Sequence, residues 1–365
     1  MTALVSKTMK SSQPFIYEAH AARVVFGAGS SSQVAAEVER LGAKRALVLC
    51  TPNQQAEAER IADLLGPLSA GVYAGAVMHV PIESARDATA RAREAGADCA
   101  VAVGGGSTTG LGKAIALETG MPIVAIPTTY AGSEVTPVYG LTEAGTKRTG
   151  RDPRVLPRTV IYDPALTVGL PRGLSVTSAL NAIAHAAEGL YARDANPVMS
   201  LMAEEGIRAL AAGIPAVFND PADLDARSQC LYGAWLCGTV LGGVGMALHH
   251  KLCHTLGGSF NLPHAETHTI VLPHALAYNA AAVPEAMARI RRATGAGEQS
   301  AAATLFDLAQ RHGAPVALRD IGMREEDLDR AADIALASPY WNPRPIEREP
   351  IRALLQAAYE GVRPD

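Results

Sequence analysis

Histidines are concentrated in one part of the chain. The sequence has 365 residues and ten histidines, and six of these fall between His249 and His274. His250 and His254 are four residues apart, and His264 follows ten residues later. Residues four apart lie on one face of a helix, and clustered imidazoles are typical of metal sites or acid–base sites. We therefore predict a functional site that includes these three histidines.

A second pair of polar side chains with helical spacing occurs earlier in the chain. Asn181 and His185 are four residues apart in an apolar segment. Three imidazoles can hold zinc, whereas an iron site typically adds a carboxylate. Asn181 is neutral and a poor ligand, and Glu188 belongs to a different part of the expected helix. These residue types do not exclude a metal ion, but the missing carboxylate counts against one. We interpret the remaining histidines as structural residues: His20, His79, His249, His268, His274 and His312.

Glycines and hydroxyl residues follow two of the expected strands. Gly104–Gly106 and Ser107 come directly after the apolar run Cys99–Val103, and a loop over Pro127–Thr136 follows the run Ile123–Ile126. Glycines let the backbone approach a ligand closely, and the first N–H groups of a following helix suit a pyrophosphate. Open α/β sheets bind ligands at this edge. We predict dinucleotide binding through Gly104, Gly105, Gly106, Ser107, Thr128, Thr129, Ser133 and Thr136.

The residues after another expected strand bear on the choice of dinucleotide. The run Ala46–Cys50 is followed by Thr51 and Asn53, which we add to the predicted cofactor contacts. An acidic residue here would bind the ribose hydroxyls of NAD and repel the 2′-phosphate of NADP. There is none, and no nearby arginine favours NADP strongly. We expect both NADH and NADPH to be used, with NADH adequate.

The elements that must position these residues change in type along the chain. Compact apolar runs alternate with helical patterns up to residue 163, which predicts βαβ units and a mostly parallel sheet. From residue 164 onward the patterns are almost entirely helical. We therefore predict an α/β domain over 1–163 and an all-α domain over 164–365. The expected strands are 23–26, 46–50, 99–103, 123–126 and 159–162. The expected helices are 33–41, 56–65, 84–95, 176–193, 197–218, 224–256 (ending at Gly257–Gly258) and several beyond 283.

Composition excludes several classes of protein. The chain is 48% hydrophobic and 19% charged with a net charge of −4, so it can bury large cores and is not a globally basic nucleic-acid binder. Its five cysteines are widely spaced and indicate neither a disulfide scaffold nor a zinc ribbon. The charge-free run 230–248 is barely long enough to span a membrane, and we interpret it as a buried helix. We expect a soluble, cytoplasmic protein, a homodimer, with no nucleic-acid or membrane partner.

Along most of its length the chain resembles the iron-dependent (group III) alcohol dehydrogenase family. The resemblance lies in Gly104–Ser107, in the loop Pro127–Glu134, in the two histidine pairs and in Pro263-His264 followed by Leu272-Pro273-His274. It implies a Rossmann-like N-terminal domain and a helical C-terminal domain, an architecture shared with dehydroquinate synthase, with NAD(P) in the cleft between them. The family's metal ligands, one Asp and three His, match these positions in order: Asn181, His185, His250 and His264.

Two departures from that family pattern refine the resemblance. Asn181 replaces the aspartate ligand, and Gly110 stands where the family usually carries an aspartate. Together with the segment Lys147–Asp152, these departures resemble one branch of the family. Members of that branch reduce the carbon–carbon double bond of maleylacetate to give 3-oxoadipate, late in bacterial aromatic-ring degradation, and are held to need no metal. The resemblance thus implies NAD(P)H-dependent reduction of a small dicarboxylate without a metal.

The chemistry of that reaction suggests roles for the histidines. Hydride transfer to an alkene conjugated with a ketone leaves an enolate that must be stabilised and then protonated at carbon, and histidines can do both near neutral pH. We predict that His250 and His254 polarise the substrate and deliver the proton, and that His185 and His264 bind a carboxylate. Motif proximity adds Lys147 to the cofactor contacts. The substrate contacts predicted beside these are Asn181, Arg148 and Arg344, with Arg151 a further candidate.

Other functions stay open at this point. One is a metal-dependent alcohol or aldehyde dehydrogenase that tolerates Asn181. Another is a lyase resembling dehydroquinate synthase, which would show no net turnover of the cofactor. A binding protein without catalytic activity is the least favoured alternative, because the sequence predicts a polar histidine cluster opposite a nucleotide loop.

Overall fold

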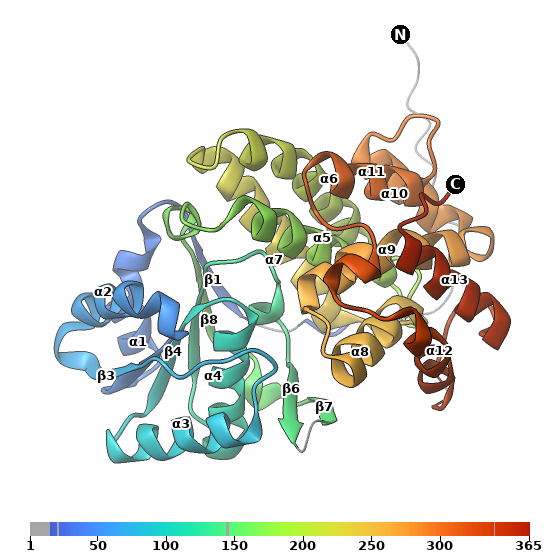
Figure 1. Ribbon diagram of the computed structural model, residues 1–365. Helices are drawn as coiled ribbons and strands as arrows, with labels where there is room; N and C mark the ends of the chain where they lie inside the picture. The colour runs from blue at the N-terminus through green and yellow to red at the C-terminus, as the bar shows by residue number, and fades with distance from the viewer. Residues whose placement is uncertain (1–14, 20–21, 144–145, 339) are drawn as a thin grey trace, which may run out of the picture.

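The chain folds into a sheet-containing part and a helical part that lie side by side (Figure 1). The computed structural model describes residues 15–19, 22–143, 146–338 and 340–365, and at 146–147 the backbone alone. The expectation for His20 lies outside this range. The α/β-plus-all-α fold class predicted from the sequence is confirmed by this arrangement.

A six-stranded sheet forms the centre of the first part. Its strands are all parallel, in the order β1-β8-β5-β4-β2-β3. The strands β2, β4, β5 and β8 are buried along their whole length, as expected for a parallel sheet covered on both faces. Their bounds are β1 Arg23–Phe26, β2 Ala46–Leu49, β3 Ser69–Tyr73, β4 Cys99–Gly104, β5 Ile123–Pro127 and β8 Thr159–Tyr162.

Helices cover both faces of this sheet. Because side chains alternate along a strand, Val48 packs with α1 (Val34–Arg40) and α2 (Gln55–Leu65), whereas Leu47 and Leu49 pack with α3 (Ile82–Glu94) and α4 (Gly106–Thr119). The five strands expected from the sequence are confirmed to within a residue or two. The strand β3 and an antiparallel hairpin of β6 (Val138–Glu143) and β7 (Thr146–Arg151) were not predicted.

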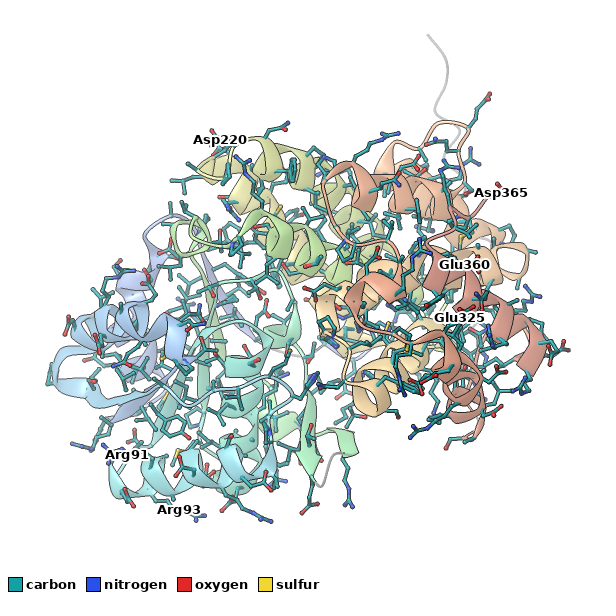
Figure 2. All side chains as sticks on the ribbon, viewed as in Figure 1. Arg91, Arg93, Asp220, Glu325, Glu360 and Asp365 are labelled. Atoms are coloured by element: carbon teal, nitrogen blue, oxygen red, sulfur yellow. The ribbon has the colours of Figure 1, made fainter. Side chains whose placement is uncertain are left out.

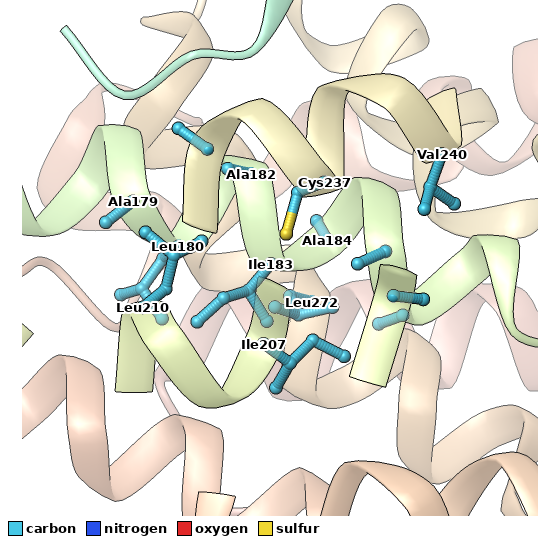
Figure 3. Packing of buried hydrophobic residues seen from close by; sticks show 14 of the residues in the cluster. Ala179, Leu180, Ala182, Ile183, Ala184, Ile207, Leu210, Cys237, Val240 and Leu272 are labelled. Atoms are coloured by element: carbon cyan, nitrogen blue, oxygen red, sulfur yellow. The ribbon is translucent and has the colours of Figure 1, made fainter. Parts of the chain in front are cut away.

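The helical part is built around one central helix, α5 (Arg172–Gly189), which is buried along nearly all of its length. Small residues let its neighbours approach: Figure 3 shows Ala179, Ile183 and Ala184 packed among side chains of α6, α7 and α9. The six charged residues labelled in Figure 2 are exposed at the surface. The bounds are α6 Pro197–Asn219, α7 Leu224–Gly243, α8 Leu248–Phe260, α9 His264–Asn279, α10 Pro284–Thr294, α11 Ala301–Arg311, α12 Leu328–Leu336 and α13 Arg348–Glu360.

The single helix expected over 224–256 is wrong. It is two helices, α7 and α8, bent by 96°. Val244 is extended (φ −141°, ψ 167°) after Gly242 and Gly243, and the N–H of Gly245 donates to Asp194. The expected helix end at Gly257–Gly258 is also wrong, because α8 continues to Phe260 and ends at left-handed Asn261. Within the described residues no single helix is long and apolar enough to cross a membrane, and α7 with α8 meets those criteria only as a bent pair.

The two parts are held together by close packing of the loop after β5 on α7. Gly132 in this loop has φ +78°, and a Cβ atom at Gly238 of α7 would overlap its carbonyl oxygen. Next to this contact, the guanidinium of the fully buried Arg227 donates to the hydroxyls of Tyr130 and Ser175, each at 2.9 Å. The loop predicted to bind a nucleotide is therefore anchored to the domain that carries the histidines.

Candidate functional site

Three helices bring the predicted histidines together. His185 comes from α5, His250 and His254 from α8, and His264 from α9. The ring centroids of His185 and His250 are 5.1 Å apart, and those of His250 and His254 are 6.2 Å apart. Asn181 lies one turn before His185 and is buried with it. The structure thus brings these residues together, whereas their catalytic and binding roles stay predictions.

Two histidines that we interpreted as structural lie inside the same cluster. The ring centroid of His268, on α9, is 4.4 Å from that of His264 and 5.1 Å from that of His250. A hydrogen bond of 2.9 Å joins His268 Nδ1 to His249 Nε2, and both side chains are buried. The spacing of four residues between His264 and His268 is the signal in the sequence that could have identified His268 as a member of the cluster.

Glu188 is a further member that the sequence analysis set aside. Its fully buried carboxylate accepts from His250 Nδ1 at 2.7 Å and from the backbone N–H groups of Ala247 and His249 at 2.9 and 2.7 Å. It therefore caps the start of α8 and orients the His250 ring, whose Nε2 atom is buried and has no hydrogen-bond partner among the residues that the structure describes. Glu188 follows His185 by three residues, a helical spacing that places both toward α8.

Burial keeps three imidazoles of the cluster uncharged. Loss of solvation holds the pKa of His185, His249 and His268 well below the ordinary histidine value, and the neighbouring histidines, with His250 prominent among them, lower it further. These three rings are neutral at pH 7 and act as hydrogen-bonding groups. His254 is exposed and His264 is partly exposed, so the cluster runs from a dry interior to the surface.

The donor atoms do not fit the metal site that the family resemblance implies. Asn181 Oδ1, His185 Nδ1 and His250 Nε2 are buried and unpartnered in the part of the chain that the structure describes. An amide oxygen and three imidazoles are all neutral, so they would not offset the positive charge of a divalent ion. Iron sites typically include a carboxylate. The neighbouring carboxylate, Glu188, is already occupied by His250 and by backbone N–H groups.

The predicted nucleotide contacts gather at the carboxyl edge of the sheet. Thr51 and Asn53 follow β2, Gly104–Ser107 joins β4 to α4, and Thr128 and Thr129 follow β5. The loops are bonded to one another, because Thr128 N donates to the carbonyl of Gly104 at 3.1 Å. A Cβ atom at Gly106, the first residue of α4, would meet nothing within 4 Å. This open, uncapped helix start suits a pyrophosphate, so the residues fit NAD(P).

The remaining cofactor candidates have partners within the protein. The ammonium of Lys113, a fully buried side chain on α4, donates to Thr136 Oγ1 at 2.9 Å and to the carbonyls of Ser133 and Val138 at 2.7 Å. Lys113 thus secures the loop that carries Ser133 and Thr136. The side chain of Lys147 lies outside the described residues.

Two of the three predicted arginines are bonded to backbone carbonyls. Arg148 is exposed on β7, and Arg151 donates to the carbonyls of Gly242 and Leu241 in α7. The Arg344 guanidinium lies 4.0 Å from the centroid of the Tyr278 ring and donates to the carbonyl of that residue at 3.0 Å. Tyr278 is 14 residues beyond His264 in α9, or about 21 Å at the rise of an α-helix. Arg344 therefore lies toward the end of α9 opposite to His264.

Comparison with known proteins identifies relatives over nearly the whole chain. The family model "Iron-containing alcohol dehydrogenase" matches residues 21–164, and "Fe-containing alcohol dehydrogenase family, C-terminal" matches residues 175–359. The maleylacetate reductase of Burkholderia cepacia is 63% identical over 350 residues, which cover 96% of this chain and 99% of that protein. That of Rhizobium sp. strain MTP-10005 is 58% identical and covers 97% of this chain and 100% of its own. The crystal structure of maleylacetate reductase from Agrobacterium tumefaciens matches with a TM-score of 0.92 at 58% identity, over 97% of this chain and 100% of that one.

Proposed function

The chain belongs to the iron-containing alcohol dehydrogenase family and is an oxidoreductase, and from this premise we propose that it reduces the carbon–carbon double bond of maleylacetate to give 3-oxoadipate. The reductant is NADH or NADPH, and no metal ion takes part. The observation that carries the proposal is 63% identity to a maleylacetate reductase across 96% of the chain. The histidine cluster and Asn181 support it independently. Their unpartnered atoms offer a substrate neutral polar groups, and the carboxylate of Glu188 is bonded to His250.

The reaction needs a hydride, an oxyanion site and a proton. When bound at the carboxyl edge of the sheet, NAD(P)H supplies the hydride. Hydride adds to the alkene carbon β to the ketone, the double-bond electrons move toward the ketone oxygen, and an enolate forms. A proton from the protein then adds at the α carbon and restores the ketone. The product has gained one hydride and one proton, and the oxidised nucleotide leaves.

We assign to His250 the stabilisation of the enolate oxygen and the transfer of the proton. The Glu188 carboxylate accepts from His250 Nδ1 at 2.7 Å, so the Nε2 atom is the one that can meet the substrate. A carboxylate behind an imidazole fixes its tautomer and stabilises the imidazolium form, as in hydrolase triads. His254, one turn further along α8, is exposed and can exchange protons with solvent. Together the two residues supply the proton that the α carbon receives.

The neutral residues of the cluster are suited to a dianionic substrate. His185 is buried and uncharged, and Asn181 beside it carries an amide where the family has a carboxylate. N–H groups of both residues can donate to a substrate carboxylate, whereas an aspartate at position 181 would repel it. We assign His185, His264 and Asn181 to substrate binding. Cofactor selectivity rests on Thr51 and Asn53, neither of which repels a 2′-phosphate.

A substrate panel measured with and without a chelator tests the proposal. Consumption of NADH and of NADPH would be followed with maleylacetate and with a series of aldehydes, before and after extensive EDTA treatment. We expect consumption with maleylacetate at undiminished rate after EDTA, stoichiometric formation of 3-oxoadipate, and little turnover of the aldehydes. Loss of activity on chelation that zinc or iron restores would support a metal-dependent alcohol dehydrogenase instead, for which the unpartnered atoms of His185 and His250 are the supporting observation.

A further inference from the structure

A thiol lies beside two of the buried imidazoles, behind the face that we assign to the reaction. His249, Cys253 and His268, here called the thiol–imidazole cluster, are all buried, and one potential ligand atom from each lies within 4.8 Å of the other two. His249 Nε2 is 2.9 Å from His268 Nδ1 and 3.6 Å from Cys253 Sγ. None of the three occupies a position matched to the family's metal ligands.

The donor set suits a thiophilic ion of borderline softness. Burial keeps both imidazoles neutral, which is the form that binds metals. Zinc binds imidazole nitrogen at about 2.0–2.1 Å and thiolate sulfur at about 2.3 Å in tetrahedral geometry, which puts ligand atoms about 3.3–3.6 Å apart. The distance from Cys253 Sγ to His249 Nε2 already matches, and the nitrogen–nitrogen distance needs to open by a few tenths of an ångström. The sulfur also lies within 4.8 Å of the ligand atom of His268. Small rotations of two rings would therefore complete three ligands.

We propose that the thiol–imidazole cluster is a binding site for one Zn²⁺ ion, and that its occupation inhibits the enzyme. On binding, the Cys253 S–H bond breaks, sulfur bonds to the ion as thiolate, and one proton is released to solvent. His249 Nε2 and His268 Nδ1 give up their hydrogen bond and coordinate through their lone pairs. The ring protons then lie on His249 Nδ1 and His268 Nε2, the two buried atoms that have no partner among the described residues.

Inhibition follows from the contacts of His268. Its ring centroid is 4.4 Å from that of His264 and 5.1 Å from that of His250. Turning this ring toward a metal shifts the packing surface of both residues. The ion also brings a net positive charge close to the rings that we assign to the reaction. Because the cluster lies behind partly exposed His264, we expect inhibition to develop slowly after zinc is added.

Cobalt provides a readout that does not depend on activity. Co²⁺ replaces Zn²⁺ in such sites and gives a thiolate-to-cobalt charge-transfer band in the near ultraviolet. Titration of the full-length, chelator-stripped protein with Co²⁺ should give this band at one ion per chain. The band should be absent in Cys253→Ser and retained in Cys237→Ser, which makes the same change at another buried cysteine, on α7. It should also be retained in His185→Ala, which removes a family ligand position.

Several outcomes would overturn the proposal. These are absence of the band in the parent chain at saturating cobalt, its persistence in Cys253→Ser, or cobalt binding that His185→Ala abolishes and Cys253→Ser does not. If Cys253→Ser fails to fold by circular dichroism, His249→Gln and His268→Gln replace it and should lose the band. In assays, zinc should lower turnover of the parent chain about 10- to 100-fold, the loss typical when a supporting residue of a site is disturbed, and leave Cys253→Ser unaffected. The cobalt result stands or falls separately from the substrate assignment.

Discussion

The sheet edge and the histidine cluster are built in opposite ways. At the sheet edge the groups that we predict to face the nucleotide are backbone N–H groups and small residues that directly follow β4 and β5 in sequence. The cluster is made of side chains from α5, α8 and α9, and its key atoms are held by partners on other helices, such as Glu188 behind His250. A backbone-built site depends on the absence of side chains, whereas a side-chain-built site depends on the orientation of each group. Changes at the two sites should therefore have different signatures.

The largest effect should come from removing the ring of His250. We expect His250→Ala to lower kcat/KM for maleylacetate about 10²- to 10⁴-fold, the contribution typical of a general acid or base, without weakening NADH binding measured by fluorescence. His312→Ala is the matched control, because the His312 ring bonds to the carbonyl of Leu308 in α11 and packs on Phe218. Equal kcat/KM in the two variants would remove His250 from the mechanism.

The next effect tests whether orientation matters at the cluster. Glu188→Gln keeps an oxygen acceptor for the backbone of α8 and loses the charge behind His250. We expect kcat to fall about 10- to 100-fold, as for other residues that orient a functional histidine, with KM for NADH unchanged. Glu204→Gln, which alters a surface carboxylate paired with Arg289 and Arg292, is the control. A change confined to thermal stability would show that Glu188 only caps the helix.

Acid should destabilise the helical part through its buried neutral histidines. Burial lowers the pKa of His274 to about 4, whereas in the unfolded chain it is about 6.5. Between these values the unfolded state binds more protons, so stability falls as pH falls, by about 1.4 kcal/mol per pH unit for each such histidine. We expect the free energy of unfolding from denaturant titrations to drop between pH 6.5 and 4. His274→Gln should reduce that slope, and an unchanged slope would contradict a neutral His274.

A methyl group at the sheet edge should harm binding without harming the fold. A Cβ atom at Gly106 meets nothing within 4 Å, and alanine is preferred over glycine within a helix by up to about 1 kcal/mol. We expect Gly106→Ala to fold at least as stably as the parent and to raise KM for NADH about tenfold, a loss of about 1.4 kcal/mol in affinity. Gly173→Ala, at an open position near the start of α5, serves as the control. An unchanged KM would place the nucleotide elsewhere.

The smallest effect is expected at Arg344. Its guanidinium stacks on Tyr278 about four helical turns from His264. We expect Arg344→Ala to change KM for maleylacetate by less than about twofold, since surface substitutions away from a site usually cost within about 0.5 kcal/mol. A large rise in KM would restore this residue to the substrate contacts predicted from the sequence.

The sheet edge was predictable because its signals are local. Five strands and the glycine loop appear as short apolar runs followed by turn residues, and the structure places them within a residue or two of those predictions. The strand β3 escaped notice because it is only half-buried and contains Gly71. The hairpin of β6 and β7 was not predicted because β7 consists mostly of polar residues and β6 is only partly buried.

The cluster was predictable only in part, because its geometry is tertiary. Helical spacing was enough to pair Asn181 with His185 and His250 with His254. The break between α7 and α8 was not visible in a continuously apolar run, since it depends on Glu188 and Asp194, which bond to the backbone there from another segment of the chain. Without that break, His249 could not be placed beside Glu188 and His268.

Isotope transfer tests the central claim most directly. The chelator-treated protein would be given maleylacetate and NADH deuterated at C4 of the nicotinamide, and the product would be analysed by mass spectrometry and NMR. Reduction of the double bond predicts 3-oxoadipate with one deuterium on the carbon β to the retained ketone. A hydroxy dicarboxylate with deuterium on its carbinol carbon would show carbonyl reduction instead and would contradict the account.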